Sequence, residues 1–248
     1  MKENIRFVML AAGRGSRLEN ITDNHPKCMT EIGDKSLIKS QLEVIKNFSN
    51  QVAVVTGYLA HVLEDHLSGD NINFFHSNNW QQSNMVSSLL CAQSWFKDST
   101  VIVCYTDILY SKDAIEKLIA TKGDIVIPYY TKWKELWSNR FTNPLDDLES
   151  FKITADQNLI EIGKKASSLQ DIEGQFMGIM KFTAQGWNQC IDLLNKLDNK
   201  EIAKLDSTKL LNRLIIEEQP IKTIAINDFW LEIDSKNDYA LYKDIVLS

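Results

Sequence analysis

The segment from Phe7 to Lys27, FVMLAAGRGSRLENITDNHPK, constrains the fold of this chain more than any other. It begins with a short apolar run whose length suits a strand buried on both faces of a parallel sheet. Small residues and two glycines follow directly. Gly13 and Gly15 can adopt positive φ and let backbone N–H groups approach an anion, and a helical start just beyond would aim its dipole at the same place. The segment therefore predicts a strand that leads into a phosphate-binding loop.

Two cations, Arg17 and Lys27, bracket the polar residues after this loop, and Lys27 directly follows Pro26. Both side chains could therefore contact one polyphosphate. The glycine spacing is neither that of a P-loop nor that of a dinucleotide-binding fold, so neither class is indicated. The alternative is an ordinary glycine turn followed by an unrelated surface lysine.

The composition sets broader limits on the fold and the partners. The 248 residues, 44% of them hydrophobic, fit one large α/β domain or a core with a small lid. A net charge of −6 argues against nucleic acid as a partner. The four scattered cysteines form no C-x-x-C pair, which argues against a zinc site or a disulfide framework. No signal peptide and no apolar run long enough to cross a membrane is visible, so we expect a cytoplasmic protein with no membrane partner.

Strand and helix patterns alternate along the chain. Apolar runs that predict strands lie at 52–56, 71–77, 100–105, 124–129 and 221–226. Helical patterns lie at 36–48, 59–67, 85–96, 187–197, 206–216 and 235–246. This order is typical of an α/β fold with a Rossmann-like, doubly wound sheet. A hairpin pattern at 151–153 and 159–162 predicts a small inserted lid, so we divide the chain into a core, 1–128 and 172–248, and a lid, 129–171.

Carboxylates follow two of the predicted strands. Asp107 comes just after the strand at 100–105, on the edge where open α/β sheets bind ligands. Glu232 and Asp234 are two residues apart, so in a strand they point to the same face and repel each other unless a cation lies between them. Oxygen ligands suit a hard divalent ion, which indicates a Mg²⁺ site. The alternative for Asp107 is an Asx turn or a helix cap.

An aromatic stripe precedes the two hairpin strands within the predicted lid. Trp133, Trp137 and Arg140 share one face if this segment is helical. Core packing is the ordinary explanation for such a stripe, but a wall of aromatics with one cation also suits a substrate that carries a phosphorus-bearing acid and an amine. Gly174 and Gly178 interrupt a strand-like run, which predicts a close approach of the backbone to a ligand.

Taken together, four features resemble one family. They are the L-A-A-G-x-G-x-R-L loop with Pro26-Lys27, the Ser83-Asn84-Met85 stretch, Asp107, and W-L-E-I-D-S at 230–235. This set is similar to the sugar-phosphate nucleotidyltransferase superfamily and, within it, to the bacterial phosphocholine cytidylyltransferase group. The resemblance spans nearly the whole chain and implies a mixed sheet of the nucleotide-diphospho-sugar transferase type.

The resemblance also implies a reaction. CMP from CTP would be joined to a small phosphorylated or phosphonate acceptor, with release of pyrophosphate, for cell-surface glycan or capsule modification. Phosphocholine, 2-aminoethylphosphonate and phosphoglutamine remain open as acceptors, and a homodimer is expected. A sugar-1-phosphate uridylyl- or thymidylyltransferase is one alternative. The other is a non-catalytic nucleotide-binding regulator, which would be expected to have lost Lys27 or a metal carboxylate.

The same resemblance assigns roles to residues. Lys27 and Arg17 are the expected catalytic residues, and Mg²⁺ is expected on Asp107, Asp234 and Glu232. The expected nucleotide-binding residues are Leu10, Ala11, Ala12, Gly13, Arg14, Gly15, Ser16, Gly57, Ser83, Asn84 and Thr106. The expected acceptor-binding residues are Tyr129, Trp133, Trp137, Arg140, Glu149, Glu173, Gln175 and Trp230.

Overall fold

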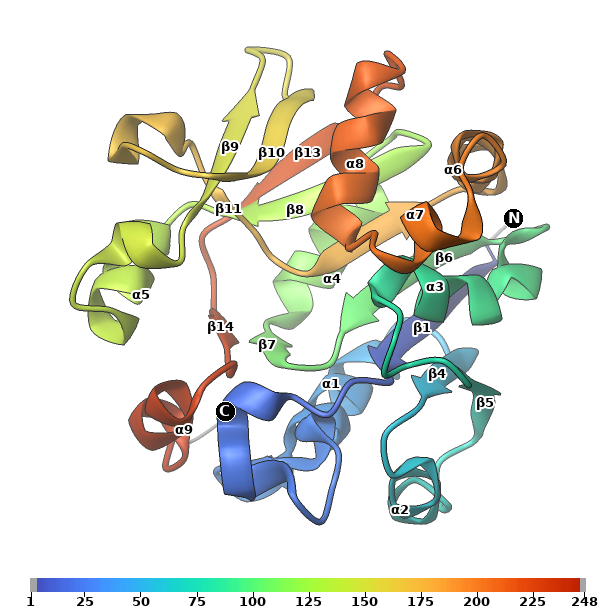
Figure 1. Cartoon of the computed structure of the whole chain (residues 1–248), viewed down its shortest axis with the longest axis vertical. Coiled ribbons are helices and arrows are strands. Elements are labelled where there is room, and N and C mark those ends of the chain that lie inside the picture. The colour runs from blue at the N-terminus through green and yellow to red at the C-terminus, as the bar shows by residue number, and fades with distance from the viewer. Residues whose placement is uncertain (1–3, 246–248) are drawn as a thin grey trace.

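The computed structural model describes residues 4–245, and an eight-stranded sheet forms its centre (Figure 1). The strands of this sheet are β1 (Ile5–Ala11), β4 (Val52–Thr56), β5 (Ile72–His76), β6 (Thr100–Tyr105), β8 (Ile125–Tyr130), β11 (Gln175–Phe176), β12 (Ile179–Phe182) and β13 (Lys222–Ile226). Their order is β11-β8-β12-β6-β1-β4-β5, with β13 paired to β8. The strands β6, β1, β4 and β5 run parallel to one another, whereas β12 is antiparallel to β6 and β8. The predicted doubly wound mixed sheet is confirmed.

Helices cover both faces of the sheet, as Figure 1 shows. They are α1 (Leu37–Ile45), α2 (Ala60–His66), α3 (Met85–Cys91), α4 (Lys112–Ala120), α5 (Trp133–Arg140), α6 (Ala184–Leu194), α7 (Asn199–Ala203), α8 (Ser207–Ile216) and α9 (Lys236–Tyr242). One hydrophobic core packs α1, α2, α4 and α5 on one face, and a second packs α3, α6 and α8 on the other. Strand β1 supplies both cores, because Phe7 and Met9 face the first and Val8 faces the second.

The inserted hairpin forms as expected, from β9 (Glu149–Ile153) and β10 (Leu159–Lys165). It is antiparallel, and its Phe151 and Ile162 belong to the second hydrophobic core. The hairpin therefore packs on the core rather than standing apart from it. The division of the chain into core and lid stays a prediction.

A short strand pair links the middle of the chain to its end. The strands β7 (Ile108–Tyr110) and β14 (Trp230–Glu232) are antiparallel, and Glu232 lies opposite Ile108. A small cluster that contains Leu18, Leu109 and Leu231 packs beside them. This pairing was not predicted, because three residues are too few to show a strand pattern. Another short hairpin joins β2 (Glu31–Ile32) to β3 (Lys35–Ser36).

Some local predictions need correction. The helix expected over 85–96 ends at Cys91 and continues as a 3₁₀ turn, Gln93–Phe96. Helix α7 was not predicted, and the last helix, expected to run to residue 246, ends at Tyr242. His66, on α2, is partly buried, and its Nε2 shares a hydrogen bond of 2.9 Å with Ser36 Oγ.

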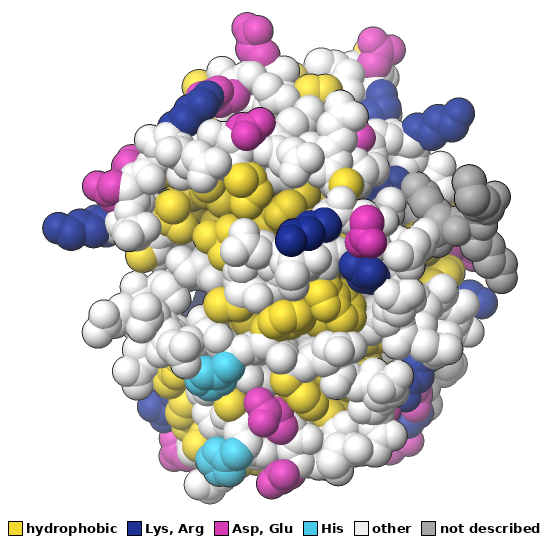
Figure 2. Space-filling model, turned by 90° about the vertical axis from the view of Figure 1, so that its right-hand side faces the viewer, with side chains coloured by type: hydrophobic (Ala, Val, Ile, Leu, Met, Phe, Trp, Pro, Cys, Tyr) yellow, Lys and Arg dark blue, Asp and Glu magenta, His cyan; other side chains and the backbone are white. Residues whose placement is uncertain are grey.

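Strand β5 forms one edge of the sheet. Figure 2 shows the side of the molecule that lies at the right in Figure 1, where hydrophobic side chains gather in separate patches among polar ones. Phe74, on β5, is 37% exposed. An open edge can pair with another chain, but the expected homodimer stays a prediction. Among residues 4–245, no helix combines the length and the apolar character that a membrane span requires.

Candidate active site

The loop after β1 lines a cavity of about 310 Å³, the loop cavity. Its lining is Leu10, Ala11, Gly13, Gly15, Ser16, Arg17, Lys27, Cys28, Met85, Tyr105, Thr106, Asp107 and Asp234. Of the two glycines, only Gly15 adopts positive φ, at 72°. A 3₁₀ turn, Ser16–Thr22, starts directly after it. The loop therefore brings its backbone to the cavity at the carboxyl end of β1, where the sheet leaves room for a ligand.

Lys27 lies at the bottom of this cavity, between two carboxylates. The side chain is buried, and Nζ is 2.7 Å from Asp107 Oδ2 and 2.5 Å from Asp234 Oδ1. Arg17 also pairs with Asp234 from the exposed side. Burial lowers the pKa of Lys27, but the charges and hydrogen bonds of both carboxylates outweigh it and raise the pKa to about 12. Lys27 is therefore a fixed cation at neutral pH.

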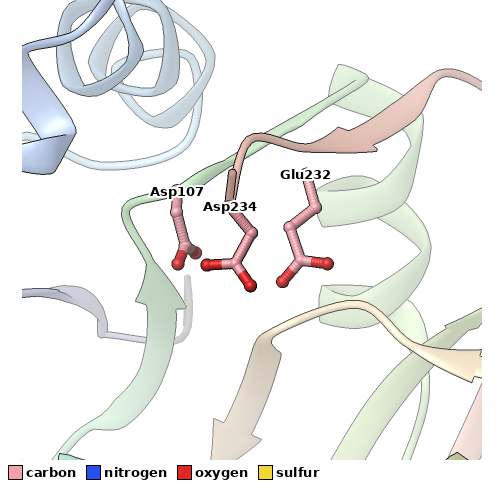
Figure 3. A group of neighbouring side chains, drawn as sticks. All are labelled: Asp107, Glu232 and Asp234. Carbon is pink, nitrogen blue, oxygen red and sulfur yellow. The ribbon is translucent and has the colours of Figure 1, made fainter. Parts of the chain in front are cut away.

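Three carboxylates meet beside Lys27, and Figure 3 shows Asp107, Glu232 and Asp234 directed toward the same space. One oxygen from each lies within 4.8 Å of the others. Burial raises the pKa of Glu232; Arg140 opposes this, but the charges of Asp234 and Asp107 add to it, and the result is a pKa of about 7. Asp107 Oδ1 is buried and accepts no hydrogen bond within residues 4–245. Such clustered oxygens, one of them without a partner, fit a hard divalent cation such as Mg²⁺.

The chain fold explains how these distant carboxylates meet. The pairing of β14 with β7 continues past Glu232, because Ile233 N donates to Asp107 O at 2.8 Å. Asp238, in the first turn of α9, then accepts hydrogen bonds from the backbone N–H groups of Asp234 and Ser235, at 3.1 and 2.9 Å. The backbone on both sides of the cluster is thus held by hydrogen bonds, which fixes the directions of its side chains.

A second cavity, the aromatic cavity, adjoins the loop cavity. Its volume is about 290 Å³, and it is lined by Arg17, Met85, Tyr105, Ile108, Trp137, Asp147, Glu149, Ser150, Phe151, Ile162, Gln175, Phe176, Met177, Gly178, Asp206, Thr208, Trp230, Glu232 and Asp234. Four of these residues also line the loop cavity, namely Arg17, Met85, Tyr105 and Asp234. The two cavities therefore meet at the cations and carboxylates described above. This arrangement can hold two anionic ligands side by side.

Comparison with known proteins agrees with this geometry. A family model described as "MobA-like NTP transferase domain" matches residues 7–165. Over 244 residues, the chain is 36% identical to the CTP:phosphoglutamine cytidylyltransferase of Campylobacter jejuni, covering 93% of this chain and 96% of that protein. The chain belongs to the MobA-like NTP transferase family. The resemblance to nucleotidyltransferases that the loop motif suggested is thereby confirmed.

Solved structures support the fold of this family member. The inositol-1-phosphate CTP transferase of T. maritima aligns with a TM-score of 0.78 at 17% identity, over 98% of this chain and 96% of that one. The CTP:phosphocholine cytidylyltransferase of Streptococcus pneumoniae aligns with a TM-score of 0.73 at 17% identity, over 97% and 98%. At sequence identities this low, the similarity shows a shared fold alone.

Some residues expected at the nucleotide lie outside the loop cavity of this NTP transferase. They are Ala12, Arg14, Gly57, Ser83 and Asn84. Each has a partner of its own: Ala12 O accepts from Tyr58 N, Arg14 pairs with Asp23, and Asn84 caps α3. Ser83 Oγ donates to Asn79 O, and Gly57 packs against Trp80. Their assignment to the nucleotide stays a prediction.

The expected acceptor residues also divide into two groups. Trp137, Glu149, Gln175 and Trp230 line the aromatic cavity, whereas Tyr129, Trp133, Arg140 and Glu173 do not. Trp133 is buried in the first hydrophobic core, and the Tyr129 hydroxyl donates to Gln157. Glu173 accepts a hydrogen bond from the backbone N–H of Ile153 at 2.7 Å. Core packing and local hydrogen bonding, the ordinary roles for such residues, account for these three.

Arg140 was expected to meet an anion of the acceptor, but its guanidinium is already paired. Its side chain is only 1% exposed, with Nε 2.7 Å from Asp238 Oδ1 and Nη1 3.1 Å from Glu232 Oε2. It also lies over the Trp137 ring, 4.9 Å from the centroid. Arg140 therefore joins α5, which carries part of the aromatic cavity, to the segment that carries Glu232 and Asp234.

The close approach predicted at Gly174 and Gly178 is to aromatic rings. A Cβ at Gly174 would lie 2.3 Å from the Tyr129 ring, and one at Gly178 would lie 2.9 Å from the Tyr105 ring. These glycines make room for side chains of the protein, which the sequence pattern could not distinguish from a ligand.

Sequence reasoning gave no role to several residues of these cavities. Met85, named only as part of the Ser83-Asn84-Met85 stretch, and Tyr105 line both cavities, while Asp147 and Asp206 line the aromatic cavity. Tyr105 could have been found, because it ends the strand that leads to Asp107. Asp206 could also have been considered, because it is the first residue of a predicted helix, and its side chain caps α8. Asp147 lies in an irregular segment that gave no pattern.

Replacing Gly15 with alanine is expected to reduce turnover, because the new Cβ would lie 2.6 Å from Lys27 Cδ and displace this side chain. The positive φ adds a destabilisation of about 1–2 kcal/mol. Gly69→Ala is the control, since nothing lies within 4 Å of its added Cβ. Steady-state kinetics and urea denaturation measure both effects. A Gly15→Ala variant with the kcat of the parent protein would show that the position of Lys27 does not depend on this glycine.

Proposed function

We propose that this NTP transferase is a CTP-dependent cytidylyltransferase that joins CMP to a small phosphorylated or phosphonate acceptor and releases pyrophosphate. The observation that carries the proposal is the position of Lys27, which lies with Asp107 and Asp234 where the loop cavity meets the aromatic cavity. The use of CTP is supported by the relative that is 36% identical and is named for this nucleotide.

The reaction needs positioning more than reactive side chains. An oxygen of the acceptor attacks the α-phosphorus of CTP, the bond to the bridging oxygen of the β-phosphate breaks, and pyrophosphate leaves with the electron pair. The nucleophile is already an anion, so no base is required. The protein must hold two anions together and neutralise the charge of the transition state.

Each part of the site has a task in this reaction. The loop from Ala11 to Ser16 offers backbone N–H groups to the phosphates of CTP. Arg17 lines both cavities and can contact the leaving pyrophosphate or the incoming anion. Lys27, fixed as a cation, neutralises charge between the α-phosphate and the acceptor.

Asp107, Asp234 and Glu232 are the residues that would hold Mg²⁺. When bound, Mg²⁺ neutralises phosphate charge and acts as a Lewis acid. Before these carboxylates can hold Mg²⁺, Lys27 and Arg17 must break the ion pairs that they form with them in the free protein. The phosphates of the nucleotide provide the new partners for both cations. We therefore expect the nucleotide and the metal to bind cooperatively.

A nucleotide panel tests the function. Pyrophosphate release is measured with CTP, UTP, dTTP, ATP and GTP, each with a mixture of phosphorylated amines and with glucose 1-phosphate. We expect activity with CTP and an amine acceptor, at least tenfold above every other pair, and its loss on addition of EDTA. Asp107→Asn should remove the activity, while Asp113→Asn, on the surface of α4, should keep it. A preference for UTP or dTTP with glucose 1-phosphate would replace this proposal with the sugar nucleotidyltransferase alternative.

Three further expectations accompany the proposal. They are a cytoplasmic location, a homodimer, and a role in the modification of cell-surface glycans. Each stays a prediction.

A further inference from the structure

Tyr58, just after β4, joins the two ends of the loop that follows β1. Its backbone N–H donates to Ala12 O at 2.9 Å. Its hydroxyl lies 3.0 Å from Thr22 O and 2.9 Å from Asp23 O. Both oxygens are carbonyl acceptors, so the single hydroxyl proton is shared between them. One residue therefore holds the chain from Ala12 to Asp23 at both ends, and we call these contacts the loop clamp.

The residues that this loop contributes to the loop cavity lie between the clamped ends. Inside the loop, Gly15 O accepts hydrogen bonds from Leu18 N at 3.0 Å and from Thr22 Oγ1 at 3.4 Å. Thr22 is fully buried, so the end of the loop that Tyr58 holds is packed into the protein. The lining residues between the ends are Gly13, Gly15, Ser16 and Arg17. Their positions therefore depend on where the clamp holds the two ends.

Arg14 reinforces the clamp from the solvent side. It is the one residue from Gly13 to Arg17 that does not line the loop cavity. Its guanidinium carbon lies 5.7 Å from the centroid of the Tyr58 ring, and Nη2 pairs with Asp23 Oδ1 at 2.7 Å. The side chain thus contacts the residues of the clamp, whereas Arg17 contributes to the cavity.

The segment before α3 supports the Tyr58 ring from another side. The ring packs edge-on against Trp80, with centroids 5.4 Å apart and planes at 63°. Gly57 permits this approach, since an added Cβ would lie 2.6 Å from Ala12 O and 2.9 Å from Trp80 Cβ. The ring is therefore in contact with both Arg14 and Trp80, which favours one orientation of its hydroxyl, toward the two carbonyls.

We propose that Tyr58 is a positioning residue for the nucleotide, which acts by holding the loop from Ala12 to Asp23 in the shape that binds the triphosphate. The inference rests on the proposed function, because it takes this loop as the binding site of the phosphates. Tyr58 lines neither cavity, so it acts through the loop and not by contact with the ligand. A loop that already has its bound shape loses less conformational entropy when the nucleotide binds.

The affinities for CTP and CMP test this role. Tyr58→Phe removes the hydroxyl and keeps the ring, and isothermal titration calorimetry with Mg²⁺ and without an acceptor gives Kd for each nucleotide. We expect Kd for CTP to rise at least fivefold, a change of about the size that one net hydrogen bond supplies. Kd for CMP should stay within about twofold, because CMP has one phosphate where CTP has three.

A matched variant and a second measurement accompany this test. Tyr242→Phe removes a hydroxyl that makes no hydrogen bond within residues 4–245, so it should leave both Kd values unchanged. In hydrogen exchange followed by mass spectrometry, the peptide that covers residues 12–23 should exchange faster in free Tyr58→Phe than in the parent protein or in Tyr242→Phe. Saturating CTP should slow its exchange in all three proteins.

An unchanged Kd for CTP in Tyr58→Phe would overturn the inference while the cytidylyltransferase function stands, even if the free energy of unfolding fell. A rise in Kd of equal size for CTP and CMP would do the same, because Tyr58 would then not act through the phosphates. A parent protein that binds UTP and not CTP would overturn the proposed nucleotide, and UTP with UMP would then decide the inference. A parent protein that binds no nucleoside triphosphate would overturn both.

Discussion

Replacing Lys27 with methionine is expected to reduce turnover about 10³-fold and to leave the chain folded. At an effective dielectric constant of about 20, a cation about 4 Å from a phosphate contributes roughly 4 kcal/mol before desolvation costs. Each 1.36 kcal/mol corresponds to a factor of about ten in rate, which gives a loss of about 10³. Methionine keeps most of the aliphatic stem that packs beside Gly15. The expected loss is therefore electrostatic.

The same variant should change metal binding in the free protein. Lys27 neutralises Asp107 and Asp234 before any ligand binds, so its removal leaves two carboxylates without their cation. We expect Lys27→Met to bind Mn²⁺ more tightly than the parent protein when no nucleotide is present, as measured by electron paramagnetic resonance of the free ion. Lys196→Met removes a surface lysine paired with Glu217 and serves as the control. Turnover within tenfold of the parent protein, with an unchanged circular dichroism spectrum, would remove Lys27 from the mechanism.

Replacing Arg140 with methionine is expected to lower the free energy of unfolding by about 3–5 kcal/mol, the usual cost of breaking a buried ion pair from one side. Both Arg140 and Asp238 have side chains that are 1% exposed. Burial alone would raise the pKa of Asp238, but the hydrogen bond and charge of Arg140 outweigh it and lower the pKa. The stabilisation is therefore present above the pKa of an unfolded aspartate, about 3.9, and is lost as the pH falls below that value.

A double variant shows how much of the stability loss comes from leaving one buried charge without its partner. Arg140→Met together with Asp238→Asn leaves no uncompensated charge, so urea denaturation should show a smaller loss than for Arg140→Met alone. Arg213→Met, at a surface arginine paired with Glu201, is the control for the loss of one positive charge. A loss below about 1 kcal/mol in Arg140→Met would contradict a structural role for the pair. Because Arg140 also holds Glu232, weaker Mn²⁺ binding should accompany the loss of stability.

Local patterns were sufficient for the elements of the sheet. The predicted strands at 52–56 and 100–105 match β4 and β6 residue for residue, because continuous apolar runs between turns have few other interpretations. Asp107, Glu232 and Asp234 were also found from sequence, since carboxylates at strand ends and two residues apart are local features. By contrast, β7 and β14 are three residues each and owe their pairing to contacts between distant segments.

The surroundings of the residues on α5 could not be predicted in the same way. Trp133, Trp137 and Arg140 share a helix face as predicted, yet only Trp137 lines the aromatic cavity. The spacing shows that the three lie together, but not what lies opposite them. For Arg140 the partner is Asp238, 98 residues further along the chain.

The sequence by itself determined that this chain forms a doubly wound α/β sheet with a glycine loop after its first strand and a nucleotidyltransferase signature, because these depend on residues close together in the chain. The tertiary structure alone decided which groups share a cavity. Lys27 meets Asp234 across 207 residues, and Gln175 meets Glu149 through a backbone carbonyl across 26. Such contacts arise from packing between elements, whose geometry no local pattern records.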